Sequence, residues 1–238
     1  MKKLIALLLA LVMVLALAAC APANEGSETT TGSEEAVKVM SYAEYAAAEL
    51  DSAVVVECYV QNHQSWWDNK ITVYAQDEDG AYFLYELACA EEDADKLVPG
   101  TKIRVKGTKS AWSGEVEIMD GSFEIIEGET WIAEALDITE KLADENLIDY
   151  QNQLIAVKGA EIEKIEYKNG EPGDDIYLTV GVGGESYSFC VEVYLTGTNS
   201  DVYTTVGELA EGDKVDIEGF LYWYEGPNPH ITAIQIAE

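Results

Sequence analysis

The sequence predicts an all-β protein with short helices, built from two similar five-stranded units in tandem. The first observation is a repeat: the stretch from Gly100 to Ile118 recurs, with glycine, lysine and aromatic positions at matching spacing, from Gly212 onward. Each copy alternates apolar and polar residues, reaches an aromatic residue, turns at a glycine and restarts, which is typical of a β-hairpin. The second observation is that further strand-like runs, separated by turn residues, surround each copy in the same order. The chain of 238 residues is long enough for two small domains.

The start of the chain predicts export and a lipid anchor. Two lysines precede an unbroken apolar run from Leu4 to Ala19, which is shorter than the roughly 20 residues of a membrane-spanning helix. The run ends in Leu17-Ala18-Ala19-Cys20, and this ending resembles the bacterial lipobox. The resemblance implies that a peptidase cuts before Cys20 and that its thiol receives a diacylglyceryl group. Two acyl chains hold a protein stably on a membrane, so we expect the chain at the extracytoplasmic face of the cell membrane.

Composition divides the rest of the chain. Residues 20–36 are small, polar and acidic and cannot bury enough apolar surface to fold, so we expect a flexible lipidated tether there. The expected division is a signal peptide at 1–19, the tether at 20–36, a first β unit at 37–128, a connector with a short helix at 129–150 and a second β unit at 151–238.

The first unit is expected to open with a short helix, because Ser41 and Glu44 have the spacing of a capping box. Five strands follow, with an acidic turn at 77–80 between the second and third, a short helical or irregular link before Gly100, and a bulge or break at Gly121. These strands are expected at 53–60, 71–77, 81–89, 102–112 and 115–126.

The connector is expected to hold a helix, since Asp137 and Glu140 repeat the cap spacing and Ile138 and Leu142 share one helix face. The second unit repeats the strand order of the first, with a longer link between its third and fourth strands. Its strands are expected at 154–167, 176–182, 185–195, 214–224 and 230–238.

Five strands with a helix or loop between the third and fourth is the order of the OB-fold, a small Greek-key barrel. Each unit enters its fourth strand through a similar stretch, which begins Leu97-Val98-Pro99-Gly100 in the first and Leu209-Ala210-Glu211-Gly212 in the second. The chain after the signal therefore resembles the tandem OB-fold lipoproteins of Gram-positive bacteria. A pair of immunoglobulin-like sandwiches is the rival fold, and five strands in each unit rather than seven disfavour it.

The net charge is strongly negative, formally −31 for the whole chain. Loss of Lys2 and Lys3 with the signal would leave 12 basic against 45 acidic residues, a charge of −33. Because nucleic-acid binding relies on lysine and arginine to neutralise phosphates, this charge predicts that nucleic acid is not a partner. Anionic lipid would be repelled in the same way, so membrane contact is expected through the covalent anchor.

No residue pattern indicates catalysis, a metal or a cofactor, so the chain is expected not to be an enzyme. His63 and His230 are the only histidines, and no G-x-S-x-G elbow accompanies them. The acidic turns lack the spacing of an EF-hand loop, and the cysteines lack the paired spacing of a metal site. Three cysteines lie in strand-like runs, where we expect small buried side chains; they are Cys58, Cys89 and Cys190.

The aromatic residues carry the candidate site. Trp66 and Trp67 lie in a polar loop between the first two strands, and Trp112 ends the fourth strand. These loops and the face of strands two and three form the binding surface of an OB-fold, so the three tryptophans are expected to form one exposed patch. Alternation along an extended chain leaves open that one of Trp66 and Trp67 faces the core. The matching place in the second unit holds Tyr222, Trp223 and Tyr224, of which Trp223 and Tyr224 are candidate binding residues.

Two functions of different classes follow. We expect a non-catalytic binding module, tethered outside the membrane, whose flat aromatic side chains meet a glycan, a peptide or a partner protein. The alternative is a structural or accessory subunit of a cell-envelope complex with no small ligand of its own. Ligand binding by the isolated protein would favour the first function, and stable co-purification with membrane proteins would favour the second.

Overall fold

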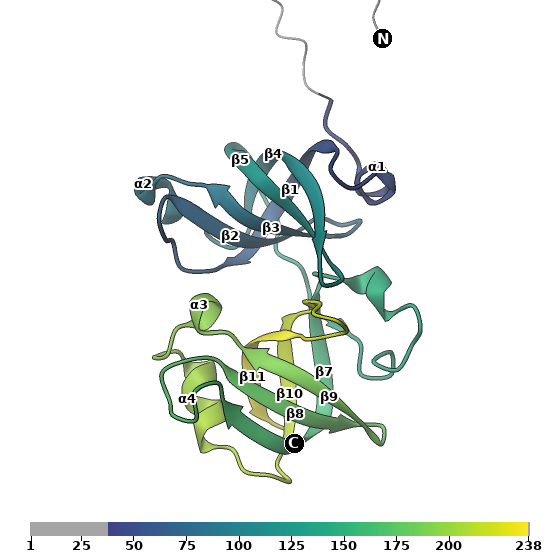
Figure 1. Ribbon diagram of the computed structural model, residues 1–238, viewed down its shortest axis with the longest axis vertical. Helices are drawn as coiled ribbons and strands as arrows, with labels where there is room; N and C mark the ends of the chain where they lie inside the picture. The colour runs from purple at the N-terminus through teal and green to yellow at the C-terminus, as the bar shows by residue number, and fades with distance from the viewer. Residues whose placement is uncertain (1–37, 238) are drawn as a thin grey trace, which may run out of the picture. The chain divides into compact units, whose positions relative to one another are not determined.

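The computed structural model describes residues 38–237, which fold into two five-stranded β-barrels joined by a short connector (Figure 1). Figure 1 draws the first barrel in purple to teal and the second in green to yellow. The predicted signal, the predicted tether and Cys20, the predicted lipidation site, lie outside the described residues. Within residues 38–237, no helix is long and apolar enough to cross a membrane.

The first barrel is closed and has the strand order of an OB-fold. Its strands pair in the order β1-β2-β3-β5-β4, and β4 pairs back onto β1. Only β3 and β5 run parallel among these pairs. The elements are α1 (Tyr42–Ala47), β1 (Ala53–His63), β2 (Lys70–Gln76), β3 (Ala81–Ala88), α2 (Glu91–Ala94), β4 (Thr101–Trp112) and β5 (Glu115–Thr130).

The second barrel repeats this order, which confirms the predicted fold class of two tandem OB-fold-like barrels. Its strands pair as β7-β8-β9-β11-β10, β10 pairs back onto β7, and the pair β9–β11 is parallel. The short strand β6 (Leu136–Asp137) adds to β7 in parallel. The remaining elements are η1 (Leu147–Tyr150), β7 (Leu154–Tyr167), β8 (Ile176–Val182), β9 (Glu185–Val191), α3 (Val193–Thr196), α4 (Asp201–Glu208), β10 (Lys214–Phe220) and β11 (His230–Ile236).

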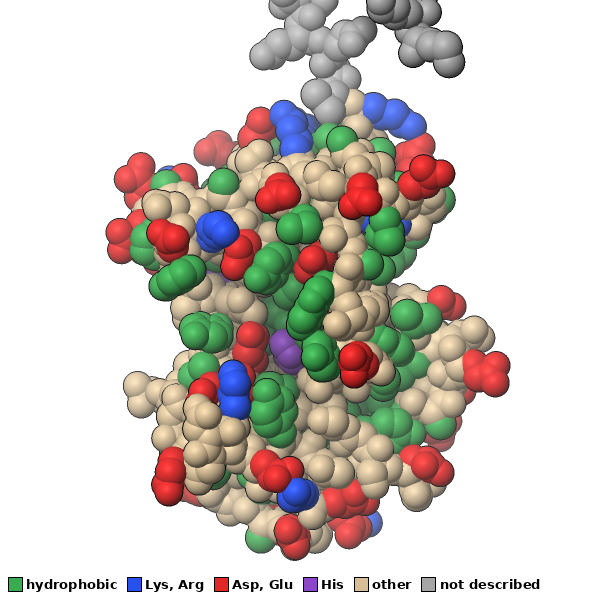
Figure 2. All heavy atoms as spheres, in the orientation of Figure 1, with side chains coloured by type: hydrophobic (Ala, Val, Ile, Leu, Met, Phe, Trp, Pro, Cys, Tyr) green, Lys and Arg blue, Asp and Glu red, His purple; other side chains and the backbone are tan. Residues whose placement is uncertain are grey.

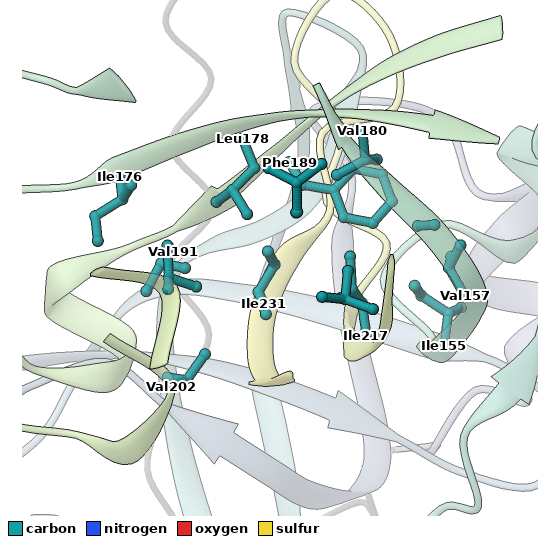
Figure 3. Packing of buried hydrophobic residues seen from close by; sticks show 14 of the residues in the cluster. Ile155, Val157, Ile176, Leu178, Val180, Phe189, Val191, Val202, Ile217 and Ile231 are labelled. Atoms are coloured by element: carbon teal, nitrogen blue, oxygen red, sulfur yellow. The ribbon is translucent and has the colours of Figure 1, made fainter. Parts of the chain in front are cut away.

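Each barrel has a core of its own, formed by the apolar residues that alternate along its strands. Figure 3 shows that of the second barrel, where Leu178 and Val180 of β8, Phe189 of β9, Ile217 of β10 and Ile231 of β11 point into one interior. The prediction that three cysteines are small buried side chains is confirmed: within residues 38–237 the free thiols are buried, and they are Cys58, Cys89 and Cys190.

Local signals in the first barrel act as predicted. The Ser41 side chain accepts the Glu44 N–H and the Glu44 carboxylate accepts the Ser41 N–H, so the capping box starts α1. The expected bulge is present as well. Between β4 and β5 the register shifts next to Gly107, and a Cβ on Gly121 would lie 3.0 Å from the Lys106 oxygen. Two glycines therefore let the long strands bend and close the barrel.

The predicted connector helix around Ile138–Leu142 is wrong. Asp137 belongs to β6, and its Oδ1 accepts both the backbone N–H and the hydroxyl of Thr139, at 3.0 and 2.7 Å. Thr139 Oγ1 in turn accepts the N–H of Lys158 on β7, which ties the turn to the second barrel. Asp137 thus caps a turn instead of a helix. The only helical turn in the described connector is the 3₁₀ segment η1.

The two barrels pack through a small aromatic cluster. Tyr74 of β2 stacks on Phe220 of β10, with ring centroids 4.4 Å apart and planes 12° apart. Phe83 and Leu195 complete the buried cluster, and Tyr222 packs at its edge. Part of the outer face of β2 and β3 is therefore covered by the second barrel, and the part beside it is left open.

Candidate functional site

A groove of about 600 Å³ lies between the open part of that face and the second barrel. Trp67 and Trp112 stand at its rim, and Tyr85 and Glu117 lie along its first-barrel side. The opposite side is contributed by Glu192, Tyr194, Tyr222 and His230. Figure 2 shows hydrophobic side chains gathered across the middle of one face of the protein, with acidic side chains spread over the rest.

Strand alternation builds the first-barrel side. Phe83 and Tyr85 are two residues apart on β3, and Glu117 and Met119 are two apart on β5, so each pair points to the same side of the sheet. Phe83 and Glu117 also lie opposite each other in the β3–β5 register. All four side chains line the groove. Its floor is thus the face of the barrel on which OB-folds bind ligands.

A tight hairpin turn presents Trp67. The Trp67 N–H donates to the Lys70 carbonyl at 3.1 Å, and the Lys70 N–H donates back to the Trp67 carbonyl at 2.9 Å. Asp68 and Asn69 between them both have positive φ, 48° and 61°, which is the geometry of a type I′ turn. The turn leaves the Trp67 side chain 70% exposed at the groove rim.

The neighbouring Trp66 does not belong to the groove, so the predicted three-tryptophan patch is wrong for this residue. Its side chain is half-buried against the core of the first barrel. Its indole Nε1–H donates to the Cys89 carbonyl at 2.9 Å. Adjacent residues in an extended segment face opposite sides, which is why one tryptophan packs inward and the other outward.

Trp112 and Tyr224 meet at one end of the groove, and Trp223 turns away from it. The Trp112 side chain is 55% exposed and lines the groove, and its ring lies 5.2 Å from that of Tyr224. Trp223 is half-buried against the core of the second barrel, and its backbone N–H donates to Glu115 at 2.9 Å. The structure therefore brings together Trp67, Trp112 and, at the margin, Tyr224 from the predicted set.

Hydrogen bonds between the barrels fix the position of the groove side that the second barrel contributes. Gln64 Nε2 contacts both carboxylate oxygens of Glu192 at 2.9 Å. The Tyr74 hydroxyl and His230 Nδ1 are 2.6 Å apart, and the same nitrogen lies 3.4 Å from Glu192. The His230 ring stacks on Tyr222 with centroids 4.3 Å apart. His230 is thus a buried link between the barrels.

Two neighbouring carboxylates in the groove differ in their partners. Glu86 forms an ion pair with Lys70, and this contact lowers the pKa of Glu86. Glu117 is 7% exposed, and burial, followed by the charge of Glu86, raises its pKa. The sequence pattern does not indicate Glu117, Tyr85, Glu192 or Tyr194 as groove residues, because nothing in it shows where the second barrel packs. Among the described residues, no group of three potential ligands is placed to hold a metal ion.

No protein-family model and no curated protein matches this chain. Solved structures do resemble it. One described as a murine DNA-binding protein bound to double-stranded DNA is 12% identical, with a TM-score of 0.37, and the match covers 77% of this chain and 95% of that one. The HINa domain of Ifi202 in complex with a 20-base-pair DNA is 14% identical, with a TM-score of 0.35, and covers 79% and 100%. At these identities the likeness concerns the fold alone.

These structures nevertheless contradict one prediction. Several of them are complexes with double-stranded DNA. The prediction that nucleic acid is not a partner of this chain is therefore wrong as an exclusion. The prediction treated the net charge of the whole chain as a measure of every surface. Lys102, Arg104 and Lys106 do alternate along one face of β4, where each forms an ion pair with a neighbouring glutamate. DNA binding itself is a property of the proteins in those complexes.

Proposed function

We propose that this chain is a non-catalytic binding module that takes its ligand in the groove between the barrels. The observation that carries the proposal is the exposed aromatic lining of the groove: Trp67, Trp112 and Tyr194 are 70%, 55% and 61% exposed. Large aromatic side chains gathered on a surface are unfavourable in water unless something covers them. They also stack on flat or apolar ligand groups at little cost in conformational entropy.

The contacts of the titratable groups support a non-catalytic role. His230 has its Nδ1 engaged by Tyr74 and Glu192 and its ring stacked on Tyr222, so it is held as part of the barrel interface. The Ser65 hydroxyl, at the rim, donates to the Tyr194 carbonyl at 3.2 Å. A nucleophile needs a base that accepts its proton, and the contacts around Ser65 and His230 serve to join the barrels instead.

We also propose that a diacylglyceryl group on Cys20 holds the module at the extracytoplasmic face of the cell membrane. The lipobox-like ending at Cys20 and the polar tether after it support this anchor. Expression of the full chain and of Cys20→Ala in a bacterium tests it by membrane fractionation and mass spectrometry. The processed chain should begin at Cys20 and carry the mass of a diacylglyceryl group, and the variant should carry no such mass. A chain that starts at Ala21 lacks both the apolar run and Cys20 and should leave the membrane fraction. Membrane partitioning of this truncated chain equal to that of the full chain would refute the proposed anchor.

Tryptophan fluorescence of the full chain in detergent micelles tests the binding proposal against panels of glycans and short peptides. A ligand should change the emission, and Trp67→Ala and Trp112→Ala should each weaken its binding by roughly tenfold or more. Tyr177→Ala is the matched control, because Tyr177 is a partly exposed aromatic residue on β8 outside the groove. If no ligand of either panel binds and the chain instead co-purifies stoichiometrically with envelope proteins, the accessory-subunit alternative replaces this proposal.

A further inference from the structure

The buried carboxylate of Glu117 points to the chemical class of the ligand. Glu117 is 7% exposed, and the small part of it that remains accessible lies in the groove. Within residues 38–237 its carboxylate has neither a hydrogen-bond donor nor a basic partner, and only burial and the charge of Glu86 act on its pKa. Buried carboxylates are ordinarily paired, because an ionised group removed from water is unfavourable without compensation. The part of Glu117 that stays accessible opens onto the groove, so any partner for its carboxylate other than water would come from a ligand there.

The surroundings of Glu117 leave its charge uncompensated. Two basic side chains line the groove, and both have carboxylate partners: Lys70 is paired with Glu86, and His230 Nδ1 lies 3.4 Å from Glu192. Glu192 accepts two contacts from Gln64 on the opposite side. The negative charge of Glu117 also affects Tyr222 across the groove. Burial, followed by the charges of Glu115 and Glu117, raises the pKa of the Tyr222 hydroxyl. The groove thus combines a negative electrostatic potential with an opening to the solvent.

Aromatic rings line the same groove as Glu117. Tyr85 precedes Glu86 on β3, and burial together with nearby carboxylates, Glu117 among them, raises its pKa. Trp112 and Tyr222 line the groove as well. A cation placed over such rings is attracted by the negative faces of their quadrupoles. Anionic groups such as phosphates would meet a buried carboxylate instead, and a metal ion would need several oxygen ligands at one point.

We propose that the groove binds an organic cation, a ligand whose ammonium or guanidinium group pairs with the Glu117 carboxylate and lies against the aromatic rings. This inference rests on the proposed binding function and narrows its ligand. The cation can belong to a free amine or to the lysine or arginine side chain of a peptide. Both sources share the same group, and the charge of the ligand distinguishes either of them from a neutral glycan.

Calorimetric titration of the full chain in detergent micelles tests the charge requirement. The probes are agmatine as a free cation, the peptide Gly-Arg-Gly, and Gly-citrulline-Gly, in which the guanidinium group is replaced by a neutral group of nearly the same shape. A charged hydrogen bond contributes about 1.5–3 kcal/mol, so the arginine peptide or agmatine should bind roughly ten- to hundredfold more tightly than the citrulline peptide. The tighter of the two cationic probes identifies the source.

Two glutamate-to-glutamine variants test whether Glu117 is the carboxylate that pairs with the cation. Glu117→Gln keeps the size of the side chain and should weaken binding of the cationic probe by the same factor. Glu127→Gln is the matched control: it removes one negative charge from the same strand at an exposed position outside the groove, and should bind as the unsubstituted chain does. The citrulline comparison uses the unsubstituted chain, so it decides the question even where Glu117→Gln folds poorly.

Four outcomes overturn the inference, and the first three leave the proposed function standing. Equal affinity for the arginine and citrulline peptides removes the requirement for charge. Unchanged affinity in a folded Glu117→Gln removes Glu117 as the partner. If only neutral glycans bind, and Trp67→Ala weakens them, the groove is a binding site for a different class of ligand and the proposed function stands. If no probe or panel member binds, both proposals fail.

Discussion

Replacing Glu115 with glutamine tests how a buried carboxyl group joins the barrels. Glu115 lies at the start of β5 and is fully buried. One carboxyl oxygen is 2.6 Å from Asn152 Nδ2, and the other accepts the Trp223 N–H at 2.9 Å, so both contacts reach the second barrel. Burial raises the pKa of Glu115 to about 8 despite these contacts. The folded chain therefore keeps a proton on Glu115 at neutral pH.

The sign of the pH dependence follows from this pKa. In the unfolded chain the group has an ordinary pKa of 4.5, and in the folded chain its pKa is about 8. Between these values the folded state binds more protons, so the free energy of unfolding falls as the pH rises. The stabilisation is fully present below pH 4.5, declines between 4.5 and 8, and is gone above that. At about 1.4 kcal/mol per pH unit, the decline amounts to roughly 4–5 kcal/mol.

Urea unfolding followed by tryptophan fluorescence, repeated at half-unit steps from pH 4 to about 9, measures this dependence. Glu115→Gln cannot lose a proton, so its unfolding free energy should change much less between pH 4.5 and 8. Self-repulsion in a chain of formal charge −31 also grows with pH, and Glu127→Gln controls for it because the substitution makes the same charge change at an exposed site. Parallel curves for the two variants over this range would show that Glu115 is ionised in the folded chain and would refute the reasoning.

Four further substitutions test local contacts by the same unfolding measurement. Trp66→Ala should lower the free energy of unfolding by about 2–4 kcal/mol, because it removes core packing and the hydrogen bond to the Cys89 carbonyl. Trp67→Ala should change the free energy of unfolding by less than about 1 kcal/mol, because its side chain is exposed. Equal effects of the two substitutions would contradict the different burial of these side chains. Lys109→Met should lower the free energy of unfolding by about 2–4 kcal/mol. The reason is that the buried ammonium group of Lys109 donates to three carbonyl oxygens at the end of α1, each at 2.9 Å. An unchanged free energy of unfolding would mean that water replaces the ammonium group. Gly219→Ala should lower the free energy of unfolding by about 1–3 kcal/mol or more, because the added Cβ would lie 2.2 Å from the His230 carbonyl oxygen, and a stable variant would show that β11 can shift.

The fold could be predicted because its signals are local. Alternation along β4 and β10, the turn residues between strands and the capping box at Ser41 each depend on neighbours within a few residues. Repetition of the same order in both halves of the chain then reinforced each assignment. The bulge at Gly121 was also predictable, because a glycine inside a strand seldom has another use.

The connector failed for a reason that local spacing does not reveal. The pair Asp137 and Glu140 has the pattern of a helix start, but Asp137 pairs with Ala156 of β7 and its side chain caps a turn. Tertiary pairing overrode the local preference, as it commonly does for short helices with few residues to bury. A spacing rule cannot anticipate a partner strand twenty residues further along the chain.

The candidate site was predictable only in its first-barrel half. Trp67 and Trp112 follow from the position of two loops in an OB-fold, and the structure places both at the groove. Glu192, Tyr194 and His230 reach the same groove only because the barrels are packed together. Strand alternation shows which side of a sheet a residue faces, but not which neighbour covers that side.

The contacts between the barrels explain why the groove has a defined shape. Gln64 with Glu192, Tyr74 with His230, and Glu115 with Asn152 each join one barrel to the other. Buried polar groups that lose their partners are strongly destabilising, so each pair disfavours any other packing of the barrels. Apolar contacts such as Tyr74 on Phe220 tolerate sliding far better, because the hydrophobic effect is not directional. It follows that a substitution at Glu115, which does not itself line the groove, should alter ligand affinity as well as stability, because the groove exists only while both barrels hold their positions.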